Sequence, residues 1–145
     1  MTENQVKEIL DRIDDVEINV EVYERPQKTD WDLFRKTFGT DFGEAFVSFT
    51  NLMSTYNFPG EVFKIIEDTK NLNDSIYSVY KYESSYPEWD DDMLPIIGYG
   101  SGDHICLNIS AGVDSRVYYF DHEINSFSKI SESFTEWIIN TNGSG

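Results

Sequence analysis

The sequence predicts a single α+β domain, in which a mostly antiparallel sheet of about five to six strands has helices packed around it. The stretch LPIIGYGSGDHICLN, residues 94–108, is typical of two apolar strands joined by a tight glycine-containing turn. A second strand pair follows at once, with RVYYFDHE at residues 116–123 and FSKI at residues 127–130. Segments with helical periodicity precede and follow these strands. Strands grouped by hairpins, with helices gathered around them, are typical of α+β domains.

The N-terminal segment begins with a predicted amphipathic helix over residues 3–14, whose apolar side chains recur at helical spacing. Residues 16–23 then alternate between apolar and polar side chains, which is the period-2 pattern of a half-buried strand that ends by Pro26. Asp30 is the candidate N-terminal cap of a short helix, and Gly39 is expected to end that helix.

Four further elements complete the predicted series. Residues 41–56 carry a mostly aromatic stripe at spacings of three and four, which predicts a helix of about four turns packed against the core. Residues 61–66 form a short candidate strand. A helix is expected to start within residues 71–74 and to run up to Pro87, and the closing helix covers ISESFTEWII, residues 130–139. The buried side of the helix before Pro87 is expected to hold Ile76, Val79 and Tyr80, with Tyr82 as a further candidate.

Length and composition indicate one folded domain. The chain has 145 residues, of which 39% are hydrophobic and 15% aromatic, far more apolar surface than disordered chains carry. No repeat, linker or low-complexity segment divides the series of elements. Residues 1–140 are therefore expected to form a single domain, and residues 141–145 a disordered tail.

The charge of the chain restricts its partners. Lys and Arg number 11 against 27 Asp and Glu, which gives a formal net charge of −16 spread over the whole sequence. Nucleic-acid binding depends on cationic groups that neutralise phosphates, so a direct DNA or RNA binder is not expected. Such a field attracts a basic partner instead and speeds its encounter in a salt-dependent way. Solubility alone could also account for this charge.

Cys106 is the only cysteine, which excludes an internal disulfide and a multi-cysteine zinc site. It lies in the apolar run ICL, where a buried structural thiol is expected rather than a nucleophile. The N-terminus MTENQVKEIL is polar and acidic, unlike a signal peptide, and no apolar run is long enough to span a membrane. The expected compartment is the cytoplasm.

Carboxylates and histidines, which are common metal ligands, cluster in the second half of the chain. Mg²⁺ and Ca²⁺ prefer oxygen ligands, and Zn²⁺ accepts His together with carboxylate. The spacing matches no EF-hand loop, no HExxH motif and no glycine-rich phosphate loop, so neither a metal nor a cofactor is expected. A metal-dependent enzyme is the third hypothesis. Its candidate ligands are the acidic run before Met93 and Asp103, His104, Asp121, His122 and Glu123 at strand ends.

Other catalytic motifs are also missing. A triad of Ser101, His104 or His122, and Asp121 can be drawn, but no GxSxG motif marks a nucleophile elbow. The GYGSG segment is followed by a strand, whereas a dinucleotide fingerprint requires a helix at that point. No catalytic residue is therefore expected.

Several segments carry a family resemblance. Pro95 before an apolar strand, the GYGSGDHICLN turn, VYYFDHE at a strand end and SFTEWI in the closing helix resemble the SUKH superfamily. This is the Smi/Knr group of bacterial immunity proteins and fungal cell-wall regulators. The resemblance covers about the C-terminal third of the chain well and the remainder in layout.

The resemblance implies a non-catalytic α+β domain that binds another protein. Bacterial members resemble immunity factors that remain in the cytoplasm, bind a cognate toxin, often a nuclease or deaminase, and block its active site. The acidic charge agrees independently, because an acidic domain can occupy a basic substrate groove as a phosphate mimic. The alternative is a regulatory scaffold or a small-ligand-binding domain on the same fold.

The contact surface is expected to combine acidic side chains with aromatic anchors, since Trp and Tyr dominate binding hot spots. The acidic members are Glu88, Asp90, Asp91, Asp92, Asp103, Asp121 and Glu123, and the aromatic ones are Tyr86, Trp89 and Tyr99.

Overall fold

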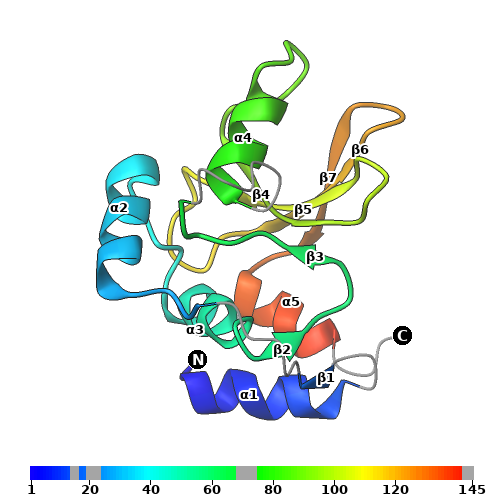
Figure 1. Cartoon of the computed structure of the whole chain (residues 1–145). Helices are drawn as coiled ribbons and strands as arrows, with labels where there is room; N and C mark the ends of the chain where they lie inside the picture. The colour runs from blue at the N-terminus through cyan, green and yellow to red at the C-terminus, as the bar shows by residue number, and fades with distance from the viewer. Residues whose placement is uncertain (14–16, 19–23, 68–74, 142–145) are drawn as a thin grey trace.

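A five-stranded antiparallel sheet lies at the centre of the molecule, with helices on both of its faces (Figure 1). The computed structural model describes residues 1–13, 17–18, 24–67 and 75–141, with the backbone alone at residues 17–18. The strands follow the order β3-β4-β5-β6-β7, so neighbours in the sheet are also neighbours in the chain. The predicted α+β class is confirmed.

Two hairpins supply most of the sheet. Strand β4 (Met93–Gly98) pairs with β5 (His104–Asn108), and β6 (Val117–Asp121) pairs with β7 (Ser126–Ser131). Strands β5 and β6 are also antiparallel neighbours, which joins the two hairpins. The short strand β3 (Glu61–Val62) extends the sheet along β4. Both predicted strand pairs are confirmed.

The lower face of the sheet in Figure 1 is covered by α1 (Glu3–Arg12), α3 (Glu44–Leu52) and α5 (Phe134–Thr141). Aromatic rings fill the space between them: the rings of Phe46 and Phe134 meet edge to face, with centroids 5.5 Å apart. These contacts belong to the main hydrophobic core. The predicted aromatic stripe is therefore core packing.

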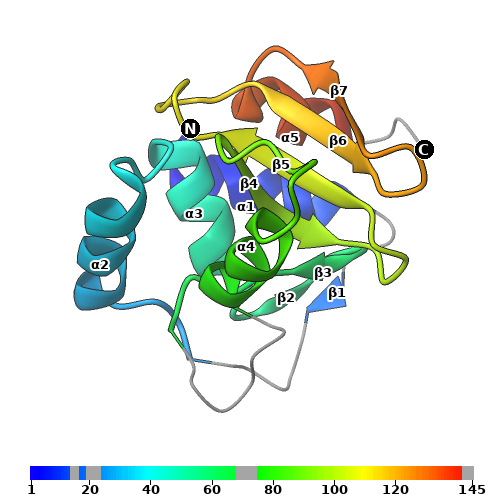
Figure 2. The same ribbon diagram turned by 90° about the horizontal axis from the view of Figure 1, so that it is seen from above.

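The opposite face is covered by α4 (Ile76–Ser84), which lies over β4 (Figure 2), and by the segment that follows it. Beneath this layer, Trp89, Met93, Cys106 and Phe120 form a second, smaller core cluster. Because helices and loops cover both faces of the sheet, β4 and β5 are buried along their whole length.

The helix α2 (Lys28–Phe38) lies beside α3, and the indole Nε1 of Trp31 donates to Asn51 Oδ1 at 3.0 Å. The prediction that Asp30 is the cap of this helix is wrong. The helix begins at Lys28, and Asp30 lies in its first turn, where its carboxylate accepts from the Gln27 backbone N–H at 2.7 Å.

The helix predicted over residues 41–56 is shorter than expected. It begins only at Glu44, because Phe42 and Gly43 have φ angles of 62° and 96°, which an α-helix excludes. After α3 the chain turns into β2 (Tyr56–Asn57), which pairs with β1 (Glu17–Ile18) in a separate two-stranded sheet.

Some predicted segments extend beyond the described residues. Residues 17–18 form a strand as expected, while 16 and 19–23 lie outside the described part of the chain, as does the expected helix start at 71–74. The strand predicted at 61–66 consists of β3 followed by an isolated bridge between Lys64 and Ser75.

At the C-terminus, α5 begins at Phe134 and not at residue 130, because residues 130–131 still belong to β7. It continues through Thr141, and residues 142–145 of the predicted tail lie outside the described residues. Over the ranges that the structure describes, no helix combines the length and the apolar character needed to cross a membrane.

Candidate binding groove

A groove runs between α4 and the turns that join β4 to β5 and β6 to β7. Its larger part has a volume of about 850 Å³, and its smaller part has a volume of about 370 Å³. The residues that line both parts are Tyr82, Glu83 and Gly102, so the two parts are continuous there. We call the whole hollow the α4 groove. Its lining also includes Phe63, Glu67, Tyr77, Lys81, Gly98 and His104 in the larger part, and Tyr86, Glu88, Trp89, Phe120, His122 and Asn125 in the smaller part.

The lining of the α4 groove is acidic and aromatic. Among the residues that the structure describes, its acidic and basic side chains are four glutamates and one lysine, Lys81. Since low-dielectric walls concentrate an electric field, such a hollow attracts cations more strongly than a flat surface of the same charge. The four glutamates are Glu61, Glu67, Glu83 and Glu88.

His104 lies at the floor of the groove, in β5. It is 8% exposed, and its ring stacks on that of Phe120, with centroids 6.2 Å apart and an interplanar angle of 14°. The ring atom Nε2 lies 3.5 Å from Glu83 Oε2, and Nδ1 has no hydrogen-bond partner in the described part of the chain. His104 is therefore packed within a strand.

Asp103 ties the two hairpin turns together. One carboxylate oxygen accepts from the Tyr119 hydroxyl at 2.6 Å. The other accepts from the His122 backbone N–H at 2.9 Å and lies 2.6 Å from His122 Nδ1. In the turn itself, Gly100 and Gly102 have φ angles of 76° and 102°, which glycine adopts without strain. We call these contacts the Asp103 clasp.

Hydrogen bonding within the Asp103 clasp shifts the acidity of its members. The Tyr119 hydrogen bond is the main cause that lowers the pKa of Asp103 from 3.8 to about 2. The same bond raises the pKa of Tyr119 to about 12, and the bond with Asp103 raises the pKa of His122. Asp103 therefore carries its charge throughout the ordinary pH range.

Three of the candidate metal ligands lie at or beside the clasp. Ligand atoms of Asp103, Asp121 and His122 lie within 4.8 Å of one another. Both oxygens of Asp103 already serve the hydrogen bonds of the clasp, and one oxygen of Asp121 accepts from the Glu123 backbone N–H at 3.0 Å. A metal ion would have to compete with these donors.

Trp89 is wrongly predicted as a surface anchor. It is 7% exposed, and its indole Nε1 donates to the Met93 carbonyl at 3.1 Å. Its ring packs edge to face against Phe120 and Phe127, with centroids 4.8 and 4.9 Å away. The indole therefore belongs to the second core cluster, whose member Cys106 is the buried thiol that the sequence predicts.

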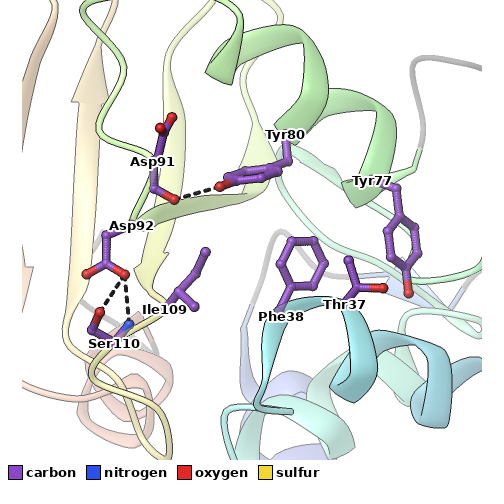
Figure 3. A pocket seen from close by; sticks show the side chains of 8 residues that line it. All are labelled: Thr37, Phe38, Tyr77, Tyr80, Asp91, Asp92, Ile109 and Ser110. Atoms are coloured by element: carbon purple, nitrogen blue, oxygen red, sulfur yellow. Dashed lines mark hydrogen bonds between the residues drawn. The ribbon is translucent and has the colours of Figure 1, made fainter.

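The acidic run around Trp89 does not form one surface. Glu88 lines the α4 groove, whereas Asp91 and Asp92 line a different hollow of about 650 Å³, opposite Phe38 of α2 (Figure 3). There the Tyr80 hydroxyl donates to the Asp91 carbonyl at 2.6 Å. The carboxylate of Asp92 accepts from Ser110, from its backbone N–H at 3.0 Å and its hydroxyl at 2.7 Å.

The remaining predicted site residues are placed as follows. Asp90 is exposed, and its carboxylate accepts from the Asp92 backbone N–H at 2.9 Å. Tyr86 and Tyr99 are exposed, as an anchor requires. The ring of Tyr99 stacks on Tyr119 of the clasp at 6.2 Å, so it lies beside Asp103.

Comparison with known proteins agrees with this architecture. The family model SUKH_5, described as SMI1-KNR4 cell-wall, matches residues 3–141. The chain belongs to the SUKH family. SUKH proteins are generally non-catalytic, and immunity-like or cell-wall-associated roles are consistent with membership. A comparison with curated proteins finds no match.

Sequence reasoning missed the inner wall of the groove in this SUKH domain. Glu83 and Tyr82 lie on α4, and Tyr82, a candidate for the buried side of that helix, is 61% exposed instead. The opposite wall includes Phe63, which follows β3. The two charged residues of this segment, Lys81 and Glu83, indicate a polar side of the helix, but they do not show what that side faces.

Proposed function

We propose that this SUKH protein is a non-catalytic immunity module of the cytoplasm, which binds and neutralises a cognate toxin with a basic active-site groove. The observation that carries the proposal is the family match over residues 3–141. The net charge of −16 supports it, because a toxin that acts on nucleic acid needs a basic substrate groove. A nuclease or a deaminase is the proposed class of toxin.

The proposed contact surface is centred on the α4 groove and the hairpin turns above it. It keeps Glu88, Asp121 and Glu123 as acidic contacts, with Tyr86 and Tyr99 as exposed aromatic anchors. Asp103 contributes mainly by holding the turns, since the clasp engages both of its oxygens. Asp90 and Asp91 are exposed, and Asp91 lines the separate hollow beside α2. Trp89 is buried in the second core cluster, where it lines the smaller part of the groove.

Co-expression with a toxin encoded next to this gene tests the proposal. We expect rescue of cell growth, a purified complex, and an association rate that falls as salt rises. Charge reversal at Glu88 and Glu123 is expected to slow association about tenfold, because rim charges act mainly on the association rate. The matched control is Glu8→Lys on α1, across the sheet. Failure to rescue growth, or binding that does not respond to salt, would contradict the proposal.

A regulatory role is the second candidate, because the family description names the cell wall and the larger part of the groove has the volume of a small-molecule site. An immunity protein requires a toxin gene beside its own, whereas a regulatory domain requires a ligand that binds in the groove. A gene with no toxin beside it, together with thermal stabilisation by a small metabolite, would favour the regulatory scaffold.

A further inference from the structure

The Glu83 carboxylate is mostly withdrawn from water at the point where the two parts of the α4 groove meet. Its side chain is 14% exposed, and its ionic neighbour is His104 Nε2 at 3.5 Å. Over the described ranges, no lysine or arginine forms an ion pair with it. Removing most of the water around a carboxylate without placing a lysine or arginine beside it costs free energy. A cation from outside the chain would offset that cost.

Aromatic rings stand beside this carboxylate. Tyr82 and Tyr86 line the groove one turn apart, with ring centroids separated by 5.5 Å at 74°. The Tyr86 hydroxyl donates to the Tyr82 hydroxyl at 2.9 Å, which holds the two rings in this arrangement. Aromatic faces attract cations, and a planar guanidinium also stacks on them.

A further polar group, the imidazole of His104, lies at the floor of the groove. His104 Nδ1 is enclosed and makes no hydrogen bond in the described part of the chain. When Nε2 carries the proton toward Glu83, Nδ1 is an acceptor that can receive an N–H donor. Gly98 and Phe63 lie beside it: a Cβ on Gly98 would lie 3.5 Å from Nδ1 and 2.7 Å from Phe63 Cζ, so the absence of that Cβ lets the Phe63 ring approach.

We propose that the α4 groove receives an arginine side chain of the protein partner, with the guanidinium against Glu83 and beside the rings of Tyr82 and Tyr86. The inference rests on the proposed protein-binding function and specifies its anchor. Arginine fits better than lysine, because its five donors in a planar fork can bond the carboxylate twice and still reach a second acceptor. The Glu83 carboxylate, the His104 nitrogen and the edge-to-face rings of Tyr82 and Tyr86 together match a planar cation with several donors.

A peptide titration of the full chain tests this anchor without the toxin. The probe is acetyl-Gly-Arg-Gly-amide, followed by NMR of the ¹⁵N-labelled protein. We expect saturable shifts at the amides of Tyr82, Glu83 and Gly102 and at the His104 ring nitrogens. The same peptide with citrulline, which keeps the shape and removes the charge, should bind at least about tenfold more weakly. The lysine peptide should fall between the two.

Variants locate the site. Glu83→Gln and Tyr82→Ala should each weaken the arginine peptide about tenfold, while Glu8→Gln, with the same loss of charge on α1, should leave it unchanged. Tyr82 is largely exposed, so its variant should fold normally. Equal binding of arginine and citrulline, shifts outside the groove, no saturable shift at all, or full binding by both groove variants would each overturn the inference.

A toxin-binding experiment separates the two proposals. If Glu83→Gln binds and neutralises the toxin as well as the unaltered protein does, the arginine anchor is wrong while the immunity function stands. If the arginine peptide binds in the groove and no toxin is bound or neutralised, the anchor stands and the immunity function is wrong.

Discussion

The Asp103 clasp supports a quantitative prediction. Asp103→Asn keeps the shape of the side chain but removes the charge that receives the Tyr119 hydroxyl at 2.6 Å and lies 2.6 Å from His122 Nδ1. The amide also presents a donor where one of these contacts needs an acceptor. We expect the variant to fold and to be less stable than the unaltered protein at pH 5.5.

The magnitude follows from the acidity of Asp103. Lowering its pKa from 3.8 to about 2 on folding corresponds to about 2.4 kcal/mol. Water at the hairpin turns screens part of this, so we expect the variant to lose about 1–2 kcal/mol, or about 2–5 °C in Tm.

The dependence on pH has a definite sign. A carboxyl group whose pKa is lowered by folding contributes its stability above the unfolded pKa of 3.8 and loses it as pH falls toward 2. About half of the contribution should be lost by pH 3. His122 has a raised pKa, so its charge supports the clasp below its unfolded pKa of 6.5 and is lost as pH rises through the folded value. The penalty should therefore be largest between about pH 4 and 6.5.

Urea unfolding followed by circular dichroism at pH 3, 4, 5.5 and 7 measures this difference. Asp121→Asn serves as the control, because Asp121 lies at the same turns and, among the described residues, its carboxylate accepts a hydrogen bond from the backbone of Glu123 within its own turn. The reasoning is refuted if Asp103→Asn costs nothing at pH 5.5, or if its cost is the same at pH 3 as at pH 5.5.

Three further predictions concern the core and the backbone. Trp89→Ala should cost about 3–5 kcal/mol in urea unfolding, because it empties a buried site; a surface anchor would cost less than about 0.5 kcal/mol. Gly43→Ala should cost about 1–3 kcal/mol, since its φ is 96° and the new Cβ would lie 2.8 Å from Val113 Cγ1. Gly39→Ala, with φ of 79° and no atom within 4 Å, measures the strain of a left-handed backbone without a new contact and should cost less; an equal cost for both would contradict the prediction for Gly43. Cys106 should not react with a disulfide reagent at pH 8 until urea unfolds the chain, because burial raises the pKa of its thiol well above the ordinary value; rapid reaction of the folded protein would contradict this.

Local patterns predicted the elements that the sequence marks most strongly. The helical spacing in residues 3–14 and the glycine turn between two apolar strands are satisfied by neighbours in the chain, so α1 and the β4–β5 hairpin follow from local residues. The helix over residues 41–56 was overestimated because its periodic stripe continues through Phe42 and Gly43. Their positive φ angles are set by the connection to α2 and by packing, which periodicity does not report.

The candidate site was less predictable. An acidic run with one aromatic residue has the appearance of a contact surface, but the chain turns at Trp89, which buries the indole and directs Glu88 and Asp92 to different hollows. The partner of Glu83 is His104, which is 21 positions away in the sequence. No local pattern brings these two side chains together.

By itself, the sequence determined the class of fold, the strand pairs, the acidic character and the resemblance to SUKH proteins, because these depend on composition, short-range periodicity and turn residues. Only the tertiary structure decided which side chains face water. The packing of α4 over β4 buries the strands on both faces, turns Trp89 inward and closes a groove around Glu83 and His104. Such contacts join elements that are distant in sequence, and their geometry is set by how layers pack rather than by the residues of any single element.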